Sequence, residues 1–419
     1  MAHPIIIIGA GLAGWTVARE FRKLDATTPL TVVTADSGDF YAKPSLSNAF
    51  AQGRLPAQLV STPAAKMADT LSVHLLAHTQ VQSINPADRT LRTTKGDLNY
   101  SQLVLATGAR PIKIALEGDA ADQVLSINSL DDFSAFHAQL TGESTDEKES
   151  AHIASSEATP APNAGQPKHV FIMGAGLIGC EFANDLAASN IKVSVADPSQ
   201  GPMSALLPDQ ASQQLQQALV DLGVTWHFGA TVKEVNRAQN EGSSQTSKLA
   251  LVLSNGQQVL ADIVLSAIGL RADTTLAHAA GLVCERGIVV DATLQTSAAH
   301  IFALGDNAQY AEGQWGSGTV PAGGRTMPYV MPIMNAARAL AITLAGKPTP
   351  VVFPLMPVAI KTPALPIVVA APVPGTPGKW QSSEPGVWQF IDASSRVLGF
   401  VLTGKNTSRR AEQAKLISA

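Results

Sequence analysis

Two stretches of the chain share one pattern of apolar and small residues. Residues 4–14 read PIIIIGAGLAG and residues 170–179 read VFIMGAGLIG, so each is a continuous apolar run that ends in glycines spaced as G-x-G-x-x-G. An amphipathic segment and a second apolar run follow each of them, LTVVTAD (30–36) in the first and KVSVAD (192–197) in the second. A continuous apolar run predicts a strand covered on both faces, and the order strand, helix, strand predicts parallel pairing with a right-handed crossover.

A similar segment closes each unit later in the chain. LVLATGARP (103–111) and IVLSAIGLRAD (263–273) are apolar runs that end in small residues, and we expect each to form a strand with a turn. The tail is rich in Pro and Val. We predict an α/β fold with two nested Rossmann-like dinucleotide-binding domains and a small C-terminal α+β domain. The predicted limits are 1–110 with 269–345 for the first domain, 111–268 for the second and 350–419 for the third.

Two segments differ in composition from the rest of the chain. The stretch 141–168 is rich in Ser, Thr, Ala, Glu and Pro, carries five acidic and two basic residues, and shows no apolar periodicity. We therefore predict a flexible, solvated insert there. A Gly-rich loop at 312–326 precedes the apolar run 329–346 and is expected to affect access to the site.

Composition and charge exclude several classes of protein. Of the 419 residues, 45% are hydrophobic and 15% are charged, which is typical of a globular chain with more than one domain. The net charge of −4 argues against nucleic acid as a partner, because phosphates need a basic surface. Two cysteines make no disulfide framework, and no apolar run reaches the ~18 residues of a membrane span. We expect a cytoplasmic monomer or weak dimer.

The first glycine motif has the residues that a dinucleotide needs. Gly9 allows the tight turn, Gly11 lets the backbone approach a pyrophosphate, and Gly14 lets the helix pack closely on the strand, while the helix N-terminus offers N–H groups to the phosphates. We assign the whole turn to cofactor binding: Gly9, Ala10, Gly11, Leu12, Ala13 and Gly14.

An acidic residue follows each glycine motif at the end of the next predicted strand. Asp36 is placed to bind a ribose hydroxyl; alternatively Thr34 and Ala35 contact the cofactor by their backbone while Asp36 faces solvent. Asp197 has the same place in the second unit, and its alternative is an Asx turn before Pro198.

The second motif repeats the first, with Gly174, Gly176 and Gly179 as its glycines. A carboxylate at Asp197 would repel a 2′-phosphate, and no Arg or Lys occurs within 198–210. We therefore predict NADH rather than NADPH as the ligand of this unit.

IFALGDNA (301–308), taken with both glycine motifs and with LVLATGARP, is similar to a motif of the FAD- and NAD(P)-binding pyridine-nucleotide oxidoreductases. The resemblance covers nearly the whole chain and preserves the order of the motifs. It implies FAD in the first unit, NAD in the second, and a carboxylate on the ribityl chain of FAD, which falls on Asp306. The alternative for Asp306 is an N-cap of the following helix.

Thiol chemistry is not expected. Disulfide reductases and NADH peroxidases of this family carry redox cysteines in the region that reads YAKPSLSNAF (41–50) here, and this stretch has none. Cys180 and Cys284 read as structural residues. We assign no covalent catalyst and no metal ligand, so electrons should leave to a separate partner.

YAKPSLS resembles a stretch of the reductases that serve small iron–sulfur or iron proteins. Three further stretches resemble the NADH:rubredoxin reductases of hydrocarbon-oxidising bacteria: GAGLIGCEFANDL, YVMPIMNAARALAITLAG and MPVAIKTPALPIVV. This resemblance implies electron flow from NADH through FAD to rubredoxin in an alkane-hydroxylating system. The alternatives are a ferredoxin or a flavorubredoxin as acceptor, or a redox-sensing binding protein.

The resemblance also carries over individual residues. Lys43 and Lys361 should lie at the flavin; the alternatives are a solvated loop lysine and a surface strand lysine. Glu181 should contact the nicotinamide carboxamide; its alternative is an ordinary acid in the first helical turn.

Two valines are expected to act through their backbone. Val81 should pair with the adenine, and Val330 should contact the pyrimidine end of the flavin, unless it simply packs in the core. Near the C-terminus, four basic residues stand against Glu412 and are expected to steer an acidic carrier: Lys405, Arg409, Arg410 and Lys415.

Overall fold

The first glycine-rich run forms the central strand of a parallel sheet in the computed structural model, which describes residues 3–142, 167–238, 248–311, 313–315, 318–320 and 324–418. All four residues of this strand, β1, are buried, as the continuous apolar run predicts. The order of the sheet is β20-β9-β1-β2-β5. The strands are β1 (Ile5–Ile8), β2 (Leu30–Val33), β5 (His74–Leu76), β9 (Gln102–Leu105) and β20 (Ile301–Ala303).

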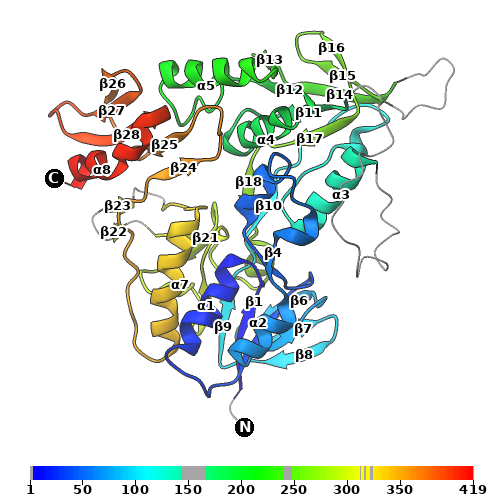
Figure 1. Ribbon diagram of the computed structural model, residues 1–419. Coiled ribbons are helices and arrows are strands. Elements are labelled where there is room, and N and C mark those ends of the chain that lie inside the picture. The colour runs from blue at the N-terminus through cyan, green and yellow to red at the C-terminus, as the bar shows by residue number, and fades with distance from the viewer. Residues whose placement is uncertain are drawn as a thin grey trace.

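Helices cover this sheet. Helix α1 (Leu12–Arg22) begins directly after the glycine turn and packs against α7 (Val330–Leu344), which comes from the far end of the chain (Figure 1). Five apolar residues of α1 face inward and enter the same apolar core as the sheet: Ala13, Trp15, Val17, Ala18 and Phe21. An antiparallel sheet lies beside α2 (Ala64–Leu71) and consists of β6 (Val81–Asn85), β7 (Thr90–Thr93) and β8 (Gly96–Asn99).

The second unit repeats this topology, as the sequence predicts. Its parallel sheet has the order β13-β12-β11-β17, so the strand before the glycine turn again lies between the next strand and a late strand of the same unit. The strands are β11 (His169–Met173), β12 (Lys192–Asp197), β13 (Thr225–Phe228) and β17 (Ile263–Ser266). Its helices are α3 (Leu130–Thr141), α4 (Leu177–Ala188) and α5 (Asp209–Asp221), and its antiparallel sheet has β14 (Val232–Arg237), β15 (Leu249–Leu253) and β16 (Gln258–Ala261).

The two closing segments are each split into two strands. The single strands expected at 103–111 and 263–273 break at Gly108 and Gly269, which have φ of +70° and +114°. The backbone turns there because a positive φ is readily available to glycine. The pieces after the turns, β10 (Ala109–Pro111) and β18 (Leu270–Ala272), pair antiparallel where the chain passes between the two units.

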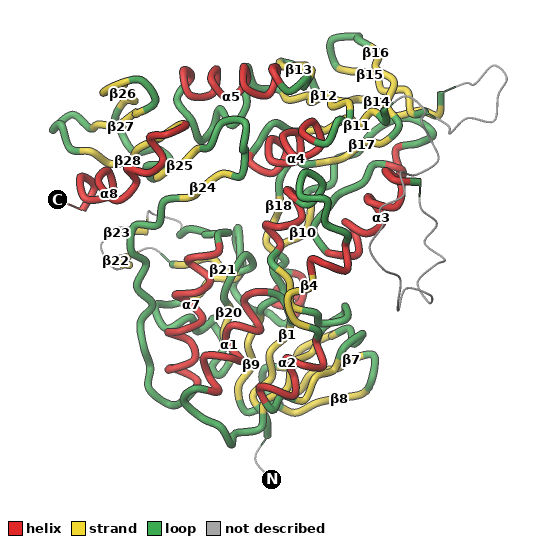
Figure 2. The backbone as a smooth tube through the Cα atoms, viewed as in Figure 1, coloured by secondary structure: helices red, strands yellow, loops and turns green. Residues whose placement is uncertain are grey.

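The C-terminal region forms an antiparallel sheet of order β24-β25-β28-β27-β26, followed by a helix. It lies beside α5 and above α7 (Figures 1 and 2). Ile367, Val369 and Trp388 of this sheet pack in one apolar core with residues of the second unit. The elements are β24 (Val358–Ile360), β25 (Ile367–Ala370), β26 (Lys379–Glu384), β27 (Val387–Ile391), β28 (Val397–Thr403) and α8 (Arg410–Ser418).

Short elements complete the described chain. The strands are β3 (Phe40–Tyr41), β4 (Val60–Thr62), β19 (Ile288–Val290), β21 (Ala308–Tyr310), β22 (Gly313–Trp315) and β23 (Gly318–Val320). The helices are α6 (Thr275–Ala279) and four 3-10 segments, Lys43–Asn48, Pro56–Leu59, Ala121–Gln123 and Gly404–Arg409.

Most of the predicted insert 141–168 lies outside the described residues. The Gly-rich stretch 312–326 lies partly outside them, and its described part contains the antiparallel pair β22–β23 in place of the predicted loop. The described chain contains no helix that is both long and apolar enough to span a bilayer.

Candidate functional site

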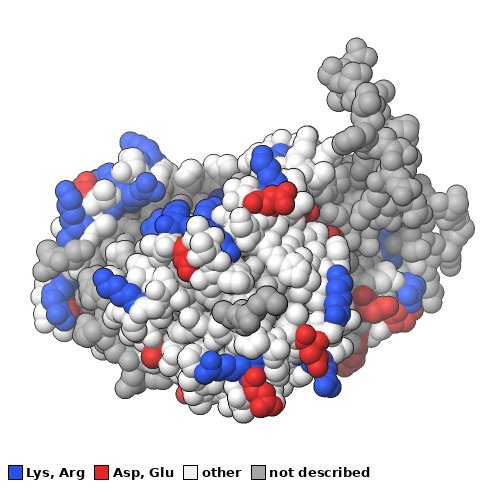
Figure 3. Space-filling view, turned by 90° about the horizontal axis from the view of Figure 1, so that it is seen from below, with Lys and Arg blue, Asp and Glu red and all other residues white. Residues whose placement is uncertain are grey.

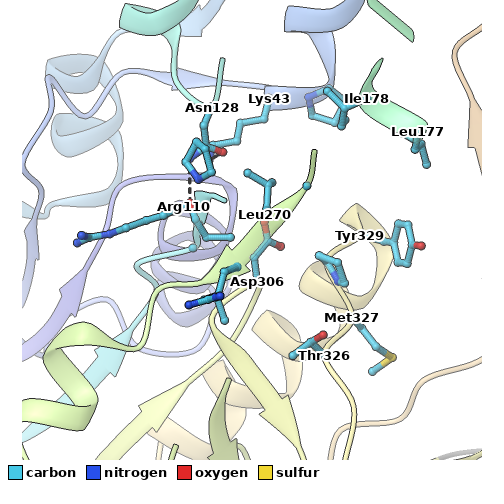
Figure 4. Close-up of a pocket in the computed structure, with 18 of the residues that line it drawn as sticks. Lys43, Arg110, Asn128, Leu177, Ile178, Leu270, Asp306, Thr326, Met327 and Tyr329 are labelled. Atoms are coloured by element: carbon cyan, nitrogen blue, oxygen red, sulfur yellow. Dashed lines mark hydrogen bonds between the residues drawn. The ribbon is translucent and has the colours of Figure 1, made fainter. Parts of the chain in front are cut away.

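A single cavity of about 2270 Å³ lies between the two parallel sheets and reaches the C-terminal sheet. A pocket for one small ligand is typically on the order of 300–1,000 Å³. The cavity therefore has room for two large ligands end to end. Figure 4 shows its centre, where Lys43 and Asn128 come from one side, Leu177 and Ile178 from the start of α4, and Tyr329 from the start of α7.

The first glycine turn has the geometry that its spacing predicts. Gly9 has φ +109°, and a Cβ there would lie 2.3 Å from the carbonyl oxygen of Ala106; a Cβ on Gly14 would lie 1.9 Å from the carbonyl oxygen of Gly9. Gly11 has no atom within 4 Å of the place of a Cβ, so its backbone is open to a ligand. The residues of this turn that line the cavity are Gly9, Ala10, Gly11, Leu12 and Ala13.

The second glycine turn is built in the same way. Gly174 has φ +102°, a Cβ on Gly179 would lie 2.0 Å from the carbonyl oxygen of Gly174, and Gly176 is open. Gly174 and Gly176 line the cavity, whereas Gly14 and Gly179 lie behind their turns, where they allow close packing of helix on strand. Both turns thus offer open backbone at the start of a helix, which suits a pyrophosphate.

Asp36 lies in a turn and not at a strand end, because β2 already ends at Val33. Its Oδ1 accepts from the N–H of Gly38 at 3.0 Å, and its side chain is exposed toward the cavity. The backbone N–H and C=O of Thr34 are both hydrogen-bonded within the first unit, to Leu76 and Thr79. Of the alternative contacts expected by backbone, Ala35 is therefore the better placed.

Asp197 ends β12 and faces the second glycine turn. Its Oδ2 accepts from the N–H of Ala175 at 2.7 Å, and its Oδ1 accepts from the N–H of Ser199 at 2.8 Å. The second bond is the Asx turn that was the alternative for this residue. Asp197 also lines the cavity, so the Asx turn fixes the carboxylate beside the glycine turn.

Glu181 is a buried carboxylate of the cavity wall, and only 2% of it is exposed. Its Oε1 accepts from the N–H of Lys361 at 3.0 Å, and its Oε2 accepts from Lys361 Nζ at 3.0 Å and Ser47 Oγ at 2.6 Å. Lys361 Nζ also donates to the carbonyl of Pro44. Lys361 is therefore not a surface strand lysine. Glu181 is the fifth residue of α4, so the alternative of an ordinary acid in the first helical turn is wrong.

Lys43 and Asp306 form a second charged group in the cavity. Lys43 Nζ donates to Asn128 Oδ1 at 3.1 Å. Burial raises the pKa of Asp306, and the nearby Lys43 partly offsets this effect; burial likewise lowers the pKa of Lys43, against the charge of Asp306. Lys43 is exposed, but it belongs to the 3-10 segment Lys43–Asn48, lines the cavity and is held there by Asn128.

The alternative for Asp306, an N-cap of the following helix, is wrong. This residue follows β20 in a turn that leads into strand β21, and the next helix, α7, begins only at Val330. The carboxylate therefore has no helix N-terminus of its own to cap, and it faces the cavity.

The two valines line the cavity in different ways. Val81 is 7% exposed at the start of β6, so its backbone edge is what the cavity meets. Val330 is 41% exposed on the first turn of α7, which excludes simple core packing.

Neither cysteine lines the cavity. Cys180 is fully buried in α4, where burial raises the pKa of its thiol, and Cys284 also has a raised pKa because of burial. A thiol with a raised pKa is a poor nucleophile. The structural interpretation of both residues therefore stands.

Asn128 is a site residue that the sequence did not reveal. It lies in SINSLDD, where Ser129 and Asp132 form a capping box at the start of α3, so its signal is hidden among ordinary helix-capping residues. An ion pair at the cavity wall, Arg110–Asp273 at 2.8 Å, was also missed because its partners lie on two different crossing segments.

Comparison with known proteins identifies the class. The sequence profile described as "Pyridine nucleotide-disulphide oxidoreductase" matches residues 3–338, and the one described as "Rubredoxin binding C-terminal domain" matches residues 350–417. The chain belongs to the pyridine nucleotide-disulphide oxidoreductase family. It is an FAD-dependent NADH oxidoreductase with FAD and NAD(H) as its cofactors.

Individual relatives show which members of the family the chain resembles. The chain is 40% identical to the "Rubredoxin-NAD(+) reductase" of Alcanivorax borkumensis, over 100% of this chain and 99% of that protein. It is 36% identical to the "Nitric oxide reductase FlRd-NAD(+) reductase" of Aeromonas salmonicida, over 97% and 95%. The covalent putidaredoxin reductase–putidaredoxin complex shares the fold, with a TM-score of 0.82 and 22% identity over 100% of this chain and 94% of that one.

The bonds of Glu181 predict a stability effect. Glu181→Ala leaves the ammonium of Lys361 without its carboxylate, and we expect the free energy of unfolding of the apoprotein to fall by about 1–3 kcal/mol, less than for a fully buried pair because Lys361 is partly exposed. Urea unfolding measures this. The double variant Glu181→Gln/Lys361→Met should recover part of the loss; equal stability of Glu181→Ala and the parent would contradict the interpretation.

The raised pKa of Asp306 predicts a pH effect with a definite sign. An aspartate whose pKa is higher in the folded state destabilises the fold when ionised, and this cost disappears as the pH falls toward 3.8, the ordinary value. Asp306→Asn should therefore raise the thermal midpoint of the apoprotein at pH 7.5, and the gain should shrink at pH 4.5. Asp122→Asn, an exposed control, should show neither change; a gain that is independent of pH would refute the assignment.

Proposed function

We propose that the protein is an NADH:rubredoxin oxidoreductase, which passes electrons from NADH through FAD to rubredoxin without a covalent intermediate on the protein. The observation that carries the proposal is the single cavity, which is lined by both glycine turns and by the C-terminal sheet and contains no cysteine. The match of residues 350–417 to a rubredoxin-binding domain and the 40% identity to a rubredoxin-NAD(+) reductase support rubredoxin as acceptor.

The residues of the first unit are suited to FAD. The open backbone at Gly11 would meet the pyrophosphate, Asp36 or the backbone of Ala35 would meet the adenosine ribose, and the backbone of Val81 would pair with adenine. The Asp306 carboxylate would accept a hydroxyl of the ribityl chain, and the backbone of Val330 would contact the pyrimidine end of the ring. We propose 1–110 and 269–345 as the FAD domain.

The residues of the second unit are suited to NADH, and we propose 111–268 as its domain. Gly176 would meet the pyrophosphate, and Asp197, fixed by Ala175 and Ser199, would meet the adenosine ribose. Glu181 would contact the carboxamide and so orient the nicotinamide. When both are bound, FAD can accept two electrons as a hydride and give them up one at a time.

The C-terminal domain, which we propose at 350–419, would receive the carrier. Figure 3 shows Lys and Arg side chains gathered on the left of one face, the side on which the C-terminal sheet lies in Figure 1. Arg409 is compensated by Glu384 and Glu412, so it contributes less than the sequence alone suggests. The other three of the four basic residues near the C-terminus are exposed and make no ion pair within the described chain: Lys405, Arg410 and Lys415.

The resemblance to reductases of hydrocarbon-oxidising bacteria supports an alkane-hydroxylating system as the destination of the electrons. The second candidate acceptor is a flavorubredoxin, which the 36% identity to an FlRd-NAD(+) reductase favours. Cytoplasmic location, a monomer or weak dimer, and the absence of a nucleic-acid partner stay predictions.

The reaction itself is tested by anaerobic stopped flow with the holoprotein, NADH and purified rubredoxin. We expect fast bleaching of the flavin and then fast reduction of rubredoxin, because both cofactor sites open on one cavity and no thiol step intervenes. A slow second step that becomes fast with flavorubredoxin would move the proposal to the second acceptor. If NADH barely bleaches the flavin, a redox-sensing protein takes its place.

The three exposed cations predict a salt-dependent docking step. Each of Lys405→Glu, Arg410→Glu and Lys415→Glu should lower the second-order rate of rubredoxin reduction about two- to tenfold at low salt, since like charges slow the encounter. The difference should shrink as salt rises, while reduction of the flavin by NADH stays the same. Lys66→Glu, an exposed control on α2, should leave both rates unchanged. If Lys66→Glu slowed rubredoxin reduction as much as the other variants do, steering by the C-terminal cations would be contradicted.

A further inference from the structure

The two lysines of the cavity differ in how their charge is compensated. Lys361 Nζ lies 3.0 Å from a carboxylate oxygen of Glu181, so this cation is neutralised locally. Lys43 Nζ instead donates to the amide oxygen of Asn128 at 3.1 Å, and within the described part of the chain it makes no ion pair. Lys43 therefore has no carboxylate bonded to it; Asp306, Asp132 and Asp36 act on its charge only from a distance and raise its pKa against the effect of burial.

Asn128 is fixed by bonds that leave its oxygen for Lys43. Its Nδ2 donates to the carbonyl of Ala109 at 2.8 Å, so the amide nitrogen faces strand β10 and the oxygen faces the ammonium. Its backbone N–H donates to Asp132 Oδ2 at 2.9 Å, in the capping box at the start of α3. Figure 4 shows the extended Lys43 side chain reaching toward Asn128.

These contacts explain why the residue at this position is an amide. A carboxylate here would neutralise Lys43, as Glu181 neutralises Lys361. An apolar residue would release the ammonium, which sits on a flexible four-carbon stem. An amide oxygen holds the ammonium without cancelling its charge, and a cation held in one place acts on a negative charge that lies close to it.

We propose that Asn128 is a positioning residue, which holds Lys43 at the flavin as a cation with no carboxylate bonded to it and so favours the negatively charged, reduced form of the ring. The inference rests on the proposed binding of FAD in this cavity. Lys43 is the residue that faces the ring, and Asn128 acts through it from a segment that belongs to the other unit.

The test is the midpoint potential of the bound flavin in the full-length holoprotein, measured by anaerobic dithionite titration with a reference dye. Asn128→Asp should raise the ratio of oxidised to reduced flavin at a fixed potential about tenfold, a shift of about 30 mV for a two-electron couple. Asn128→Ala should shift it in the same direction by less. In a Lys43→Met background, Asn128→Ala should have no further effect.

Controls separate positioning from damage to the fold. Asn85→Ala, an exposed asparagine away from the cavity, should leave the potential unchanged. Asn128→Asp has nearly the shape of the parent, so it gives an answer even if Asn128→Ala does not fold. Equal shifts by Asn128→Ala with and without Lys43, or an unchanged potential in Asn128→Asp, would overturn the proposal.

The titration is independent of NADH and of the electron carrier. A holoprotein that fails to reduce rubredoxin would therefore count against the proposed function and leave this test intact. Conversely, fast electron transfer to rubredoxin with unchanged potentials in the Asn128 variants would reject only the positioning role.

Discussion

The arrangement of the cavity depends on one buried carboxylate. Glu181 comes from α4 of the second unit, yet it accepts hydrogen bonds from Ser47 of the first unit and from both the backbone and the side chain of Lys361 in the C-terminal region. Because a buried charge without partners is costly, these bonds hold three parts of the chain in one relative position. Glu181 and its two partners, Ser47 and Lys361, all line the cavity.

The glycine turns and the parallel strands could be predicted because they follow from local sterics. Gly9 and Gly174 have backbone angles that suit glycine, and Gly14 and Gly179 sit where a Cβ would collide with the turn before it. Buried strands read as continuous apolar runs wherever helices cover both faces of a sheet. The order of the motifs along the chain then indicates the class of protein, since such spacing is rarely met twice in one chain by accident.

The sequence alone could not predict contacts between residues that are far apart along the chain. Lys361 and Glu181 are separated by 180 positions, and only the packing of the C-terminal sheet on α4 and α5 brings them together. Asn128 resembles the polar residues that start a helix, so its role toward Lys43 depends on where β10 lies. The alternative of a helix cap at Asp306 failed for a similar reason, because the next helix of the described chain begins only at Val330.

The antiparallel pair of β10 and β18 determines which part of the chain can be inserted or replaced as a unit. The chain leaves the first sheet through β10 and returns through β18, and the two strands pair over three positions, from Ala109 with Ala272 to Pro111 with Leu270. The segment between them, residues 112–269, therefore begins and ends at neighbouring positions. A segment whose ends are adjacent can be lengthened, shortened or replaced by another while the sheet of the first unit keeps its register.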